Sequence, residues 1–386
     1  MTSSAPVLSQ AVRELIARRP VFDAHADSIG RALDLGHDLG VQGAEGHLDL
    51  MRGAEGGLGS WVIVSWVDPE EHGKRAFQRA SDMMQAARDL EARHPERLRL
   101  VGNQRELQEA HADGCVAGIL GIEGGHAIEE DLGKLHQLFE GGLRVMTLVW
   151  NNHLSWIRSC QGGAGPEVPQ GLGEFGREVV AEMNYLGILV DLSHASEAAF
   201  FDVLLGGGTA PIASHSGCKA LHDHPRNLSD DQMKELAQAG GVLGIVFHPG
   251  FLNAEARAEE ARVRKLPAYR DLQDSDGARL FLQQQKAMLQ HAKPMAASHL
   301  VDHVMHAIEV MGIDHVGLGS DYDGIERGPQ WMEDARGYGV LAQLLVDRGL
   351  SIAEVEQVLG GNMERVFCAA TAKGSTAHFE LEEVLP

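Results

Sequence analysis

Residues 116–125 read VAGILGIEGG, an almost continuous apolar run that leads into a single carboxylate, Glu123. A strand with one face in water alternates apolar and polar residues, whereas a parallel strand is covered on both faces and is apolar throughout. The stretch therefore predicts a buried strand of a parallel sheet, with Glu123 near its carboxyl end.

Seven more stretches of this kind are spread along the chain, at residues 21–25, 60–66, 144–150, 187–194, 210–216, 241–247 and 314–321. Helical patterns fall between them, for example at Lys74–His94, Gly176–Tyr185, Asp230–Ala239 and His299–Met311. Strands that alternate with helices form a parallel sheet with helices outside it. Eight such units predict an α/β fold of the (β/α)8 TIM-barrel class, and a doubly wound open sheet is the alternative.

Residues 252–296 interrupt this alternation with a polar and charge-rich stretch. The stretch is too long for a bare loop, so it predicts a helical insertion near the active face; whether the insertion shapes a site or only decorates the barrel stays open. The segment 160–176, which carries glycines and prolines, is a second candidate for shaping a pocket. We expect residues 1–386 to form one domain whose core spans about residues 20–368.

The composition limits the partners and the location of the chain. Its formal net charge of −22 repels phosphate backbones, so we expect no nucleic-acid partner. No apolar stretch approaches the roughly 18 residues of a membrane span. The N-terminus is typical of a short amphipathic helix rather than a secretory signal, and the four cysteines are scattered without a Cys-x-x-Cys pair. We therefore expect free thiols and a cytoplasmic location.

The first predicted strand ends in His25 and Asp27, which are two residues apart and share one face of a strand. Both side chains bind zinc-like ions. An isolated pair of this kind is nevertheless more often a histidine hydrogen-bonded to an aspartate, because short motifs match by chance.

Other predicted strands also end in residues that bind metals or transfer protons. With the first pair, the full set is His25, Asp27, Glu123, His194, His215 and Asp321. Barrel enzymes carry their chemistry at the carboxyl ends of the strands, where three carboxylates and three imidazoles would need cations to neutralise them. The set predicts two divalent ions bridged by a carboxylate, with zinc favoured by the imidazoles. Polar residues of purely structural role are the alternative.

Five other histidines have simpler interpretations. His222 and His224 lie in a predicted loop. His303 and His306 are three residues apart on a predicted helix, where we expect them at the surface or packed at its edge. His126 follows the glycines after the third strand and is a candidate to support the nearby carboxylate through a hydrogen bond.

Longer motifs around these residues are similar to those of one known family. They are DAHAD, GIEGGHAI, MTL, FGREVVAEMNYLGILVDLSHAS, PIASHSGCKALHDHPRN, HVGLGSDYDG and GGNMERVF. In this order, from residue 21 to about residue 367, the chain resembles the membrane (renal) dipeptidases, the M19 metallopeptidases of the amidohydrolase-like barrel group. The combination of motifs is highly specific, although His-x-Asp alone is not.

The resemblance implies a binuclear zinc dipeptidase. His25 and Asp27 would bind one zinc ion, His194 and His215 would bind the other, and Glu123 would bridge them. A hydroxide bridging the metals would attack the peptide bond. Members of the family often accept a D-residue at the C-terminal position of the dipeptide, and a homodimer is implied by resemblance only.

Two further residues receive roles from the resemblance. Asp321 matches the acidic residue that contacts the bridging water and passes its proton to the leaving amine. Arg226 matches the arginine that holds the terminal carboxylate of the dipeptide, which a guanidinium does with two parallel hydrogen bonds. The residues alone favour a surface ion pair for Arg226.

One departure from the family pattern bears on function. The family motif continues to a histidine that stabilises the developing oxyanion, whereas this chain reads MTLVWNNHLSW and has Trp150 in that place. His153 lies three residues further on, and we include Trp150 and His153 as candidate substrate-binding residues. The departure keeps two alternatives open: a related metal-dependent amide hydrolase or natural-product tailoring enzyme, and a catalytically silent metal-binding barrel.

Overall fold

The structure, a computed structural model, describes residues 4–43, 45–274 and 277–372. Eight parallel strands close a barrel: β1 (Val21–Ala26), β2 (Leu58–Trp66), β4 (Val116–Glu123), β5 (Leu143–Thr147), β6 (Leu189–Asp191), β7 (Ile212–Ser216), β8 (Val242–Ile245) and β9 (Val316–Leu318). Each strand pairs with the next, and β9 pairs with β1 to complete the ring. The predicted (β/α)8 barrel is confirmed, and the open-sheet alternative is wrong because the ring is closed.

A ninth strand, β3 (Leu98–Leu100), lies outside the barrel and pairs with β4. The sequence patterns did not predict this strand. Its three residues, Leu-Arg-Leu, are too few to show a periodicity, so only its pairing reveals it.

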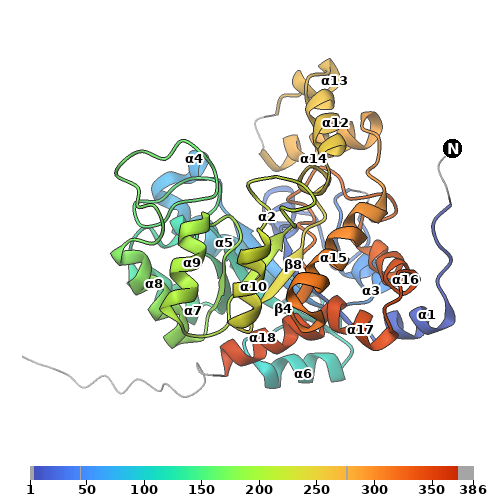
Figure 1. Cartoon of the computed structure of the whole chain (residues 1–386), viewed down its shortest axis with the longest axis horizontal. Coiled ribbons are helices and arrows are strands. Elements are labelled where there is room, and N and C mark those ends of the chain that lie inside the picture. Colours follow the sequence, from blue (N-terminus) through green and yellow to red (C-terminus); the bar gives the residue numbers. More distant parts are fainter. Residues whose placement is uncertain (1–3, 44, 275–276, 373–386) are drawn as a thin grey trace, which may run out of the picture.

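Helices cover the outside of the barrel (Figure 1). They are α1 (Gln10–Ala17), α2 (Ile29–Leu35), α3 (Leu50–Gly56), α4 (Pro69–His72), α5 (Ala76–Arg93), α6 (Gln104–Ala112), α7 (Leu132–Glu140), α8 (Glu174–Leu186), α9 (Glu197–Gly206), α10 (Asp230–Gln238), α15 (Ala297–Met311), α16 (Tyr338–Asp347), α17 (Ile352–Glu356) and α18 (Asn362–Thr371). The four helical patterns named from the sequence correspond to α5, α8, α10 and α15. A capping box fixes the start of α10, where Ser229 and Gln232 each bond the other's backbone N–H.

One end of the barrel is closed by α18. Phe367 of this helix packs on Phe22, the second residue of β1, with ring centroids 6.2 Å apart. The helix contacts β1, β6, β8 and β9 and shares an apolar cluster with residues from seven of the barrel strands. Since Phe22 lies at the start of its strand, α18 covers the amino-terminal end, and the carboxyl ends of the strands remain free for a site.

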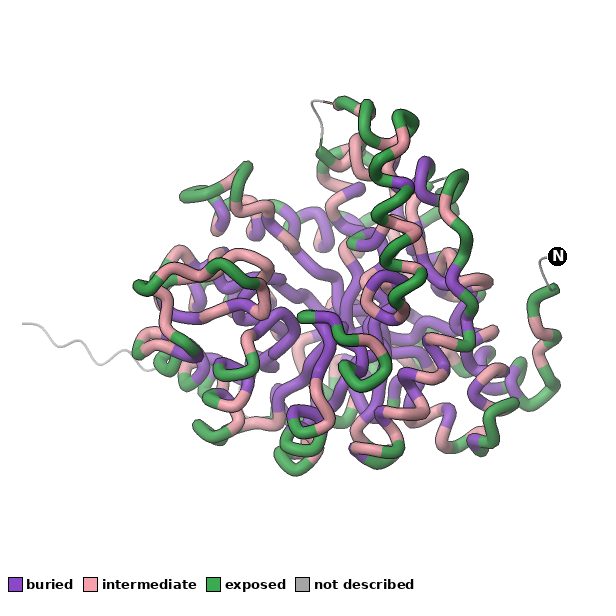
Figure 2. Tube along the Cα trace, turned by 45° about the horizontal axis from the view of Figure 1, so that its top comes forward, coloured by how far each residue is buried: buried purple, intermediate pink, exposed green. Residues whose placement is uncertain are grey.

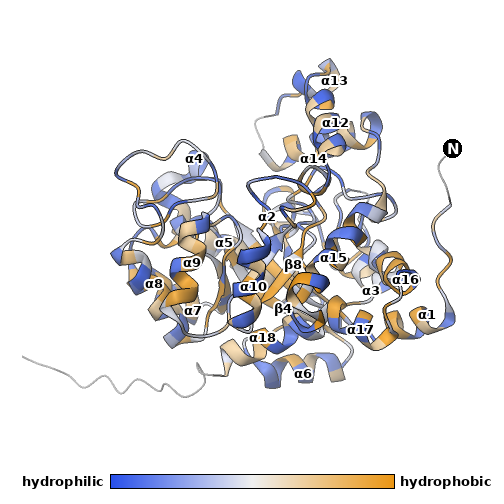
Figure 3. Ribbon diagram, viewed as in Figure 1, coloured by the Kyte–Doolittle hydropathy of each residue, from blue (hydrophilic) through white to orange (hydrophobic). Residues whose placement is uncertain are grey.

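The polar stretch expected to be an insertion is helical, as predicted. It contains α12 (Ala254–Arg264), α13 (Pro267–Arg270) and α14 (Gly277–His291), and α11 (Pro249–Leu252) leads into it, so the helical insertion begins at Pro249, three residues before the predicted boundary. In Figure 1, α12, α13 and α14 rise above the barrel. Figure 2 shows many exposed residues in this region, and Figure 3 shows hydrophilic and hydrophobic residues mixed along its helices, in contrast to the buried, hydrophobic strands.

Among the residues that the structure describes, no helix combines the length and the apolar character that a membrane span requires.

Candidate metal centre

The barrel brings the six strand-end residues to one rim. His25 and Asp27 lie at the end of β1, Glu123 ends β4, and His215 lies in β7. His194 and Asp321 follow the ends of β6 and β9 by three positions. The four that are least exposed are His25 (2%), Glu123 (5%), His194 (6%) and His215 (1%). Their positions follow from the topology, since the carboxyl ends of parallel strands meet at one end of a barrel.

Glu123 lies at the centre of this cluster. Its Oε1 is 2.9 Å from Nε2 of His194, 3.2 Å from Nε2 of His215 and 3.7 Å from Nε2 of His25. The same Nε2 of His25 is 3.6 Å from Oδ2 of Asp27. One oxygen of Glu123 is therefore close to the histidine of β1 and to the two other histidines at once.

Several polar atoms of the cluster lack partners. Nε2 of His25 and both carboxylate oxygens of Asp27 are buried and have no hydrogen bond to any described residue. The Nε2 atoms of His194 and His215 are not among these: they lie 3.1 Å apart and both approach the same oxygen of Glu123. An unsatisfied buried polar group costs about 1–3 kcal/mol, and cations would satisfy the atoms that lack partners. The donor set of imidazoles and carboxylates fits divalent ions of the zinc type.

Charge sets the protonation of the cluster. Burial alone would lower the pKa of His25, but Glu123 and Asp27 outweigh burial and raise that pKa to about 10. Burial lowers the pKa of His194 to about 4, and burial together with the charge on His25 lowers that of His215. Burial would raise the pKa of Glu123, yet His25 and the hydrogen-bonded histidines hold it well below its usual range. The metal-free cluster thus holds a proton on His25, the proton that a metal ion would displace.

Asp321 joins the cluster beside Asp27. Ligand atoms of His25, Asp27 and Asp321 all lie within 4.8 Å of one another. Burial raises the pKa of Asp321 to about 7, although the charge on His25 opposes this shift. The close approach requires Gly324, because a Cβ there would lie 2.2 Å from Oδ1 of Asp321 and 2.4 Å from Oδ2 of Asp27. A carboxyl group that titrates near neutrality can accept a proton and later release it.

The backbone around the site is strained and well supported. His194, Asp321 and Asp323 have φ angles of 67°, 61° and 65°, a region that residues other than glycine rarely adopt. Asp323 accepts hydrogen bonds from Ser28 Oγ and, at 2.8 Å, from Nη2 of Arg31. These contacts fix the turn that follows β9 and carries the strand-end aspartate.

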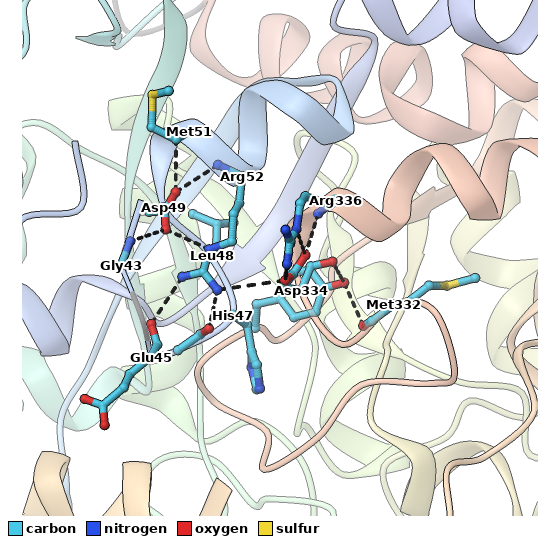
Figure 4. A network of polar contacts seen from close by, with 12 residues as sticks. Gly43, Glu45, His47, Leu48, Asp49, Met51, Arg52, Met332, Asp334 and Arg336 are labelled. Atoms are coloured by element: carbon cyan, nitrogen blue, oxygen red, sulfur yellow. Dashed lines mark hydrogen bonds and ion pairs between the residues drawn. The ribbon is translucent and has the colours of Figure 1, made fainter. Parts of the chain in front are cut away.

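A second polar network holds the rest of the segment that follows β9, as far as Asp334 (Figure 4). Tyr322 Oη donates to the carbonyl oxygens of Met332 at 3.0 Å and Asp334 at 2.9 Å. The carboxylate of Asp334 lies 4.0 Å from Nη1 of Arg52, whose Nε bonds Asp49 at 2.7 Å. The segment after β9 is thereby tied to the start of α3.

A cavity of about 330 Å³ opens over the cluster. Its lining combines polar groups with an aromatic wall of Trp66, Trp150, His248, Phe251 and Phe281. Phe251 belongs to α11 and Phe281 to α14, so the insertion shapes the site rather than only decorating the barrel. Residues of the segment 160–176 line a neighbouring cavity of about 270 Å³ that shares Arg226 with the first.

Arg226 reaches the main cavity from the loop after β7. Its side chain is buried, so the surface ion pair that the residues alone favoured is wrong. Nη2 donates to the carbonyl oxygen of His215 at 2.9 Å, the ring of Phe251 lies 5.4 Å from the guanidinium carbon, and Nε has no partner among the described residues. The guanidinium therefore keeps a free donor beside the cluster.

Trp150 lines the cavity. Its ring centroid lies 5.0 Å from that of Trp66 and 6.4 Å from that of His194. The neighbouring Asn151 was missed by the sequence reasoning, although its Oδ1 lies 3.0 Å from Nδ1 of His194 and it also lines the cavity. Its position directly after a strand-end residue was the only available signal.

His153 is not brought to the cavity. Its Nδ1 accepts the backbone N–H of Ser159 at 3.2 Å, and its Nε2 lies 3.3 Å from the carbonyl oxygen of Gly162. The ring is engaged in its own loop, so its position does not support the substrate-binding role expected for it.

The other histidines differ in their surroundings. His303 is packed and buried, so the surface alternative is wrong for this residue: its Nε2 lies 2.9 Å from the carbonyl oxygen of Leu252. His306 is half-buried, 2.9 Å from Oδ1 of Asp230. His126 has its Nε2 2.9 Å from the carbonyl oxygen of Val67, and no hydrogen bond to the rim glutamate is found within the described chain.

The chain is similar to a known protein family and to several solved structures. Residues 9–378 match the family model described as membrane dipeptidase, peptidase family M19. The solved dipeptidase AC, a metallo peptidase of family M19, is 27% identical, with a TM-score of 0.76 over 92% of this chain and 99% of that one. A metallo peptidase from Rhodobacter sphaeroides, liganded with a phosphinate mimic of the dipeptide L-Ala-D-Ala, is 27% identical, with a TM-score of 0.74 over 91% and 99%. The probable dipeptidase PvdM from Pseudomonas aeruginosa, 22% identical, shares the fold with a TM-score of 0.81 over 94% and 98%.

Proposed function

Because the chain belongs to the membrane dipeptidase family, peptidase family M19, we propose that it cleaves dipeptides with two divalent metal ions, zinc in preference to others. Membership makes it a metal-dependent hydrolase of peptide bonds. His25 and Asp27 would hold one ion, His194 and His215 the other, and Glu123 would bridge them. Nε2 of His25 and both carboxylate oxygens of Asp27, which are buried and make no hydrogen bond within the described residues, support this assignment.

The roles of the remaining residues follow from their positions at the cavity. Bound metal ions supply Lewis-acid polarisation of the carbonyl and acidify water. Asp321, which lines the cavity beside Asp27, takes a proton from the attacking water and returns it to the departing amine nitrogen. Arg226 binds the C-terminal carboxylate of the substrate with paired hydrogen bonds. One water is consumed, and two amino acids leave.

The observation that carries the proposal is a small cavity lined both by the buried guanidinium of Arg226 and by Asp27, whose carboxylate oxygens make no hydrogen bond within the described residues. Its volume of about 330 Å³ lies at the small end of ligand pockets, which span about 300–1,000 Å³. A substrate of two residues suits this space, and a long peptide does not.

The test is amino-acid release from a panel of L,L- and L,D-dipeptides by chelator-treated and zinc-restored protein. The panel includes D-residues because the Rhodobacter protein holds a mimic of L-Ala-D-Ala. We expect release only after zinc is restored, and slower release when the substrate's C-terminus is amidated. A zinc-loaded protein that cleaves none of these dipeptides would refute the proposal.

A second candidate is hydrolysis of an amide in a natural product or modified peptide. Trp150 favours it, because this indole and that of Trp66, 5.0 Å away, give the cavity an apolar wall suited to a large flat group. N-acyl amino acids with aromatic acyl groups separate the two candidates. Faster cleavage of these compounds than of any dipeptide would favour the second.

A further inference from the structure

The Nδ1 atoms of two site histidines share one partner. Nδ1 of His215 lies 2.8 Å from Oγ of Ser214, and Nδ1 of His25 lies 3.3 Å from the same oxygen. A single hydroxyl thus contacts a histidine of β7 and a histidine of β1. Both rings turn their Nε2 atoms toward Glu123.

The carboxylate of Asp191 fixes the direction of that hydroxyl. Ser214 Oγ donates to Oδ2 of Asp191 at 2.6 Å, and Thr147 Oγ1 donates to the same oxygen at 2.6 Å. Oδ1 accepts the backbone N–H groups of Ser214 at 2.8 Å and Ser193 at 3.0 Å. All four residues are buried, so water does not compete for these groups.

A serine hydroxyl has one proton and two lone pairs. Because the proton of Ser214 is committed to Asp191, its oxygen faces the rings of His25 and His215 as an acceptor. Each ring then carries a proton on Nδ1, which leaves Nε2 as the nitrogen that binds a metal ion; in His25, the metal ion first displaces the second proton that this ring holds in the metal-free protein. The hydroxyl of Ser193, 3.2 Å from that of Ser214, accepts the backbone N–H of His215 at 3.1 Å and supports the same arrangement.

We propose that Ser214, oriented by Asp191, is a shared positioning residue that sets the tautomer of His25 and His215 and thereby tunes both metal positions at once. This inference rests on the proposed function. His194 is held independently, with its Nδ1 3.0 Å from Oδ1 of Asn151. Loss of the serine hydroxyl should therefore affect both positions, whereas loss of the asparagine amide should affect one.

The test measures zinc affinity by competition with a chromophoric chelator, using the metal-depleted full chain. Ser214→Ala should weaken both zinc positions by about 10- to 100-fold. Asp191→Asn keeps the hydroxyl of Ser214 but frees its proton to point toward the two rings, so zinc affinity should fall at both positions in this variant too. Asn151→Ala should weaken one position only. Ser60→Ala is the matched control: this buried strand serine bonds a histidine away from the site, His111, at 3.0 Å, and its loss should leave zinc affinity unchanged.

The outcomes separate this inference from the proposed function. A wild-type chain that binds no zinc would overturn the proposed function. A wild-type chain that binds two ions, with Ser214→Ala binding both as tightly, would overturn the inference alone. If the variants do not fold, ¹⁵N NMR of histidine-labelled, zinc-loaded wild-type protein decides the question. Protons on Nδ1 of His25 and His215 are expected, and a proton on Nε2 of either ring would overturn the proposal.

Discussion

Two regions that line the same cavity, the strand-end rim and the helical insertion, are built in different ways. The rim consists of buried histidines and carboxylates whose atoms are fixed by strand pairing and by hydrogen bonds. The insertion, from α11 to α14, has many exposed residues (Figure 2). It gives the cavity two aromatic side chains, Phe251 and Phe281. The difference indicates a division of labour: the rim holds the reacting atoms, and the insertion sets the size and apolar character of the space above them.

The insertion is attached to the segment after β9 by partly exposed polar contacts, which agrees with this division. Arg264 of α12 pairs at 3.1 Å with Glu326 of the segment after β9, and Tyr269 of α13 donates to the same carboxylate. Partly exposed ion pairs of this kind contribute little stability, about 0–1 kcal/mol. Changes in the insertion should therefore alter substrate choice while leaving the rim intact.

Glu123→Gln should have the largest effect, because this residue contacts both halves of the rim. An amide is a weaker ligand and cannot bridge two cations, so metal content should fall at both positions. Activity should fall by more than the roughly 10²- to 10⁴-fold that one acid–base group contributes. Elemental analysis and dipeptide kinetics measure both effects, with Glu129→Gln outside the cavity as the control. A variant that keeps two ions and most of its activity would remove Glu123 from the site.

Asp321→Asn tests the chemistry of the rim apart from its metals. The amide cannot take the proton of the attacking water, so kcat should fall by about 10²- to 10⁴-fold while KM and metal content change little. A substrate whose leaving group needs no protonation should lose less. If metal is lost in proportion to activity, Asp321 is a ligand and its assignment as a proton carrier is wrong.

Arg226→Lys should have a smaller effect, on binding. Loss of the paired hydrogen bonds should raise KM for dipeptides by about tenfold or more, which corresponds to about 1.4 kcal/mol. Amidation of the substrate's C-terminus should erase the difference between the variant and the wild type. Equal kinetics on free dipeptides would show that the guanidinium does not hold the carboxylate.

Phe281→Ala tests the insertion and should have the smallest effect of the four. With one aromatic wall gone, kcat/KM for dipeptides with large apolar side chains should fall by about three- to tenfold, and that for Ala-Ala should change little. Metal content should stay the same. Leu289→Ala on the same helix is the control, since that side chain is 44% exposed. A uniform loss on all substrates would contradict the division between rim and insertion.

Most of the fold was predictable from the sequence, because parallel strands buried on both faces produce uninterrupted apolar runs. The proximity of the strand-end residues was predictable for the same reason, since the carboxyl ends of such strands meet at one rim. The short strand β3 was not, because three residues carry no periodicity. Whether the insertion lines the cavity also required the structure, which places Phe281 there.

The residues that the sequence could not place lie in loops or depend on contacts between distant segments. Arg226 is buried against Phe251 of the insertion, and His303 is covered by Leu252. His153 turns into its own loop, while Asn151, two residues before it, reaches the rim. Local patterns report periodicity and burial, but they do not report which loop residue faces a cavity.

The pH dependence of zinc binding follows from the charge of the rim. Burial lowers the pKa of His25, but Glu123 and Asp27 raise it to about 10, so the metal-free protein carries a proton there at neutral pH. Zinc must displace this proton to reach Nε2. Zinc affinity should therefore rise with pH between pH 6 and pH 8, by about tenfold per unit for this one proton. Affinity that is flat across this range would contradict the protonation assigned to His25.

Calorimetric titration of zinc into the chelator-treated full chain at pH 7, repeated in buffers of different ionisation enthalpy, tests whether the strand-end rim holds two divalent ions. We expect two zinc ions to bind per chain, with a proton released from His25 as the site fills. A chain that binds no zinc, or that binds one ion without releasing a proton, would contradict this expectation.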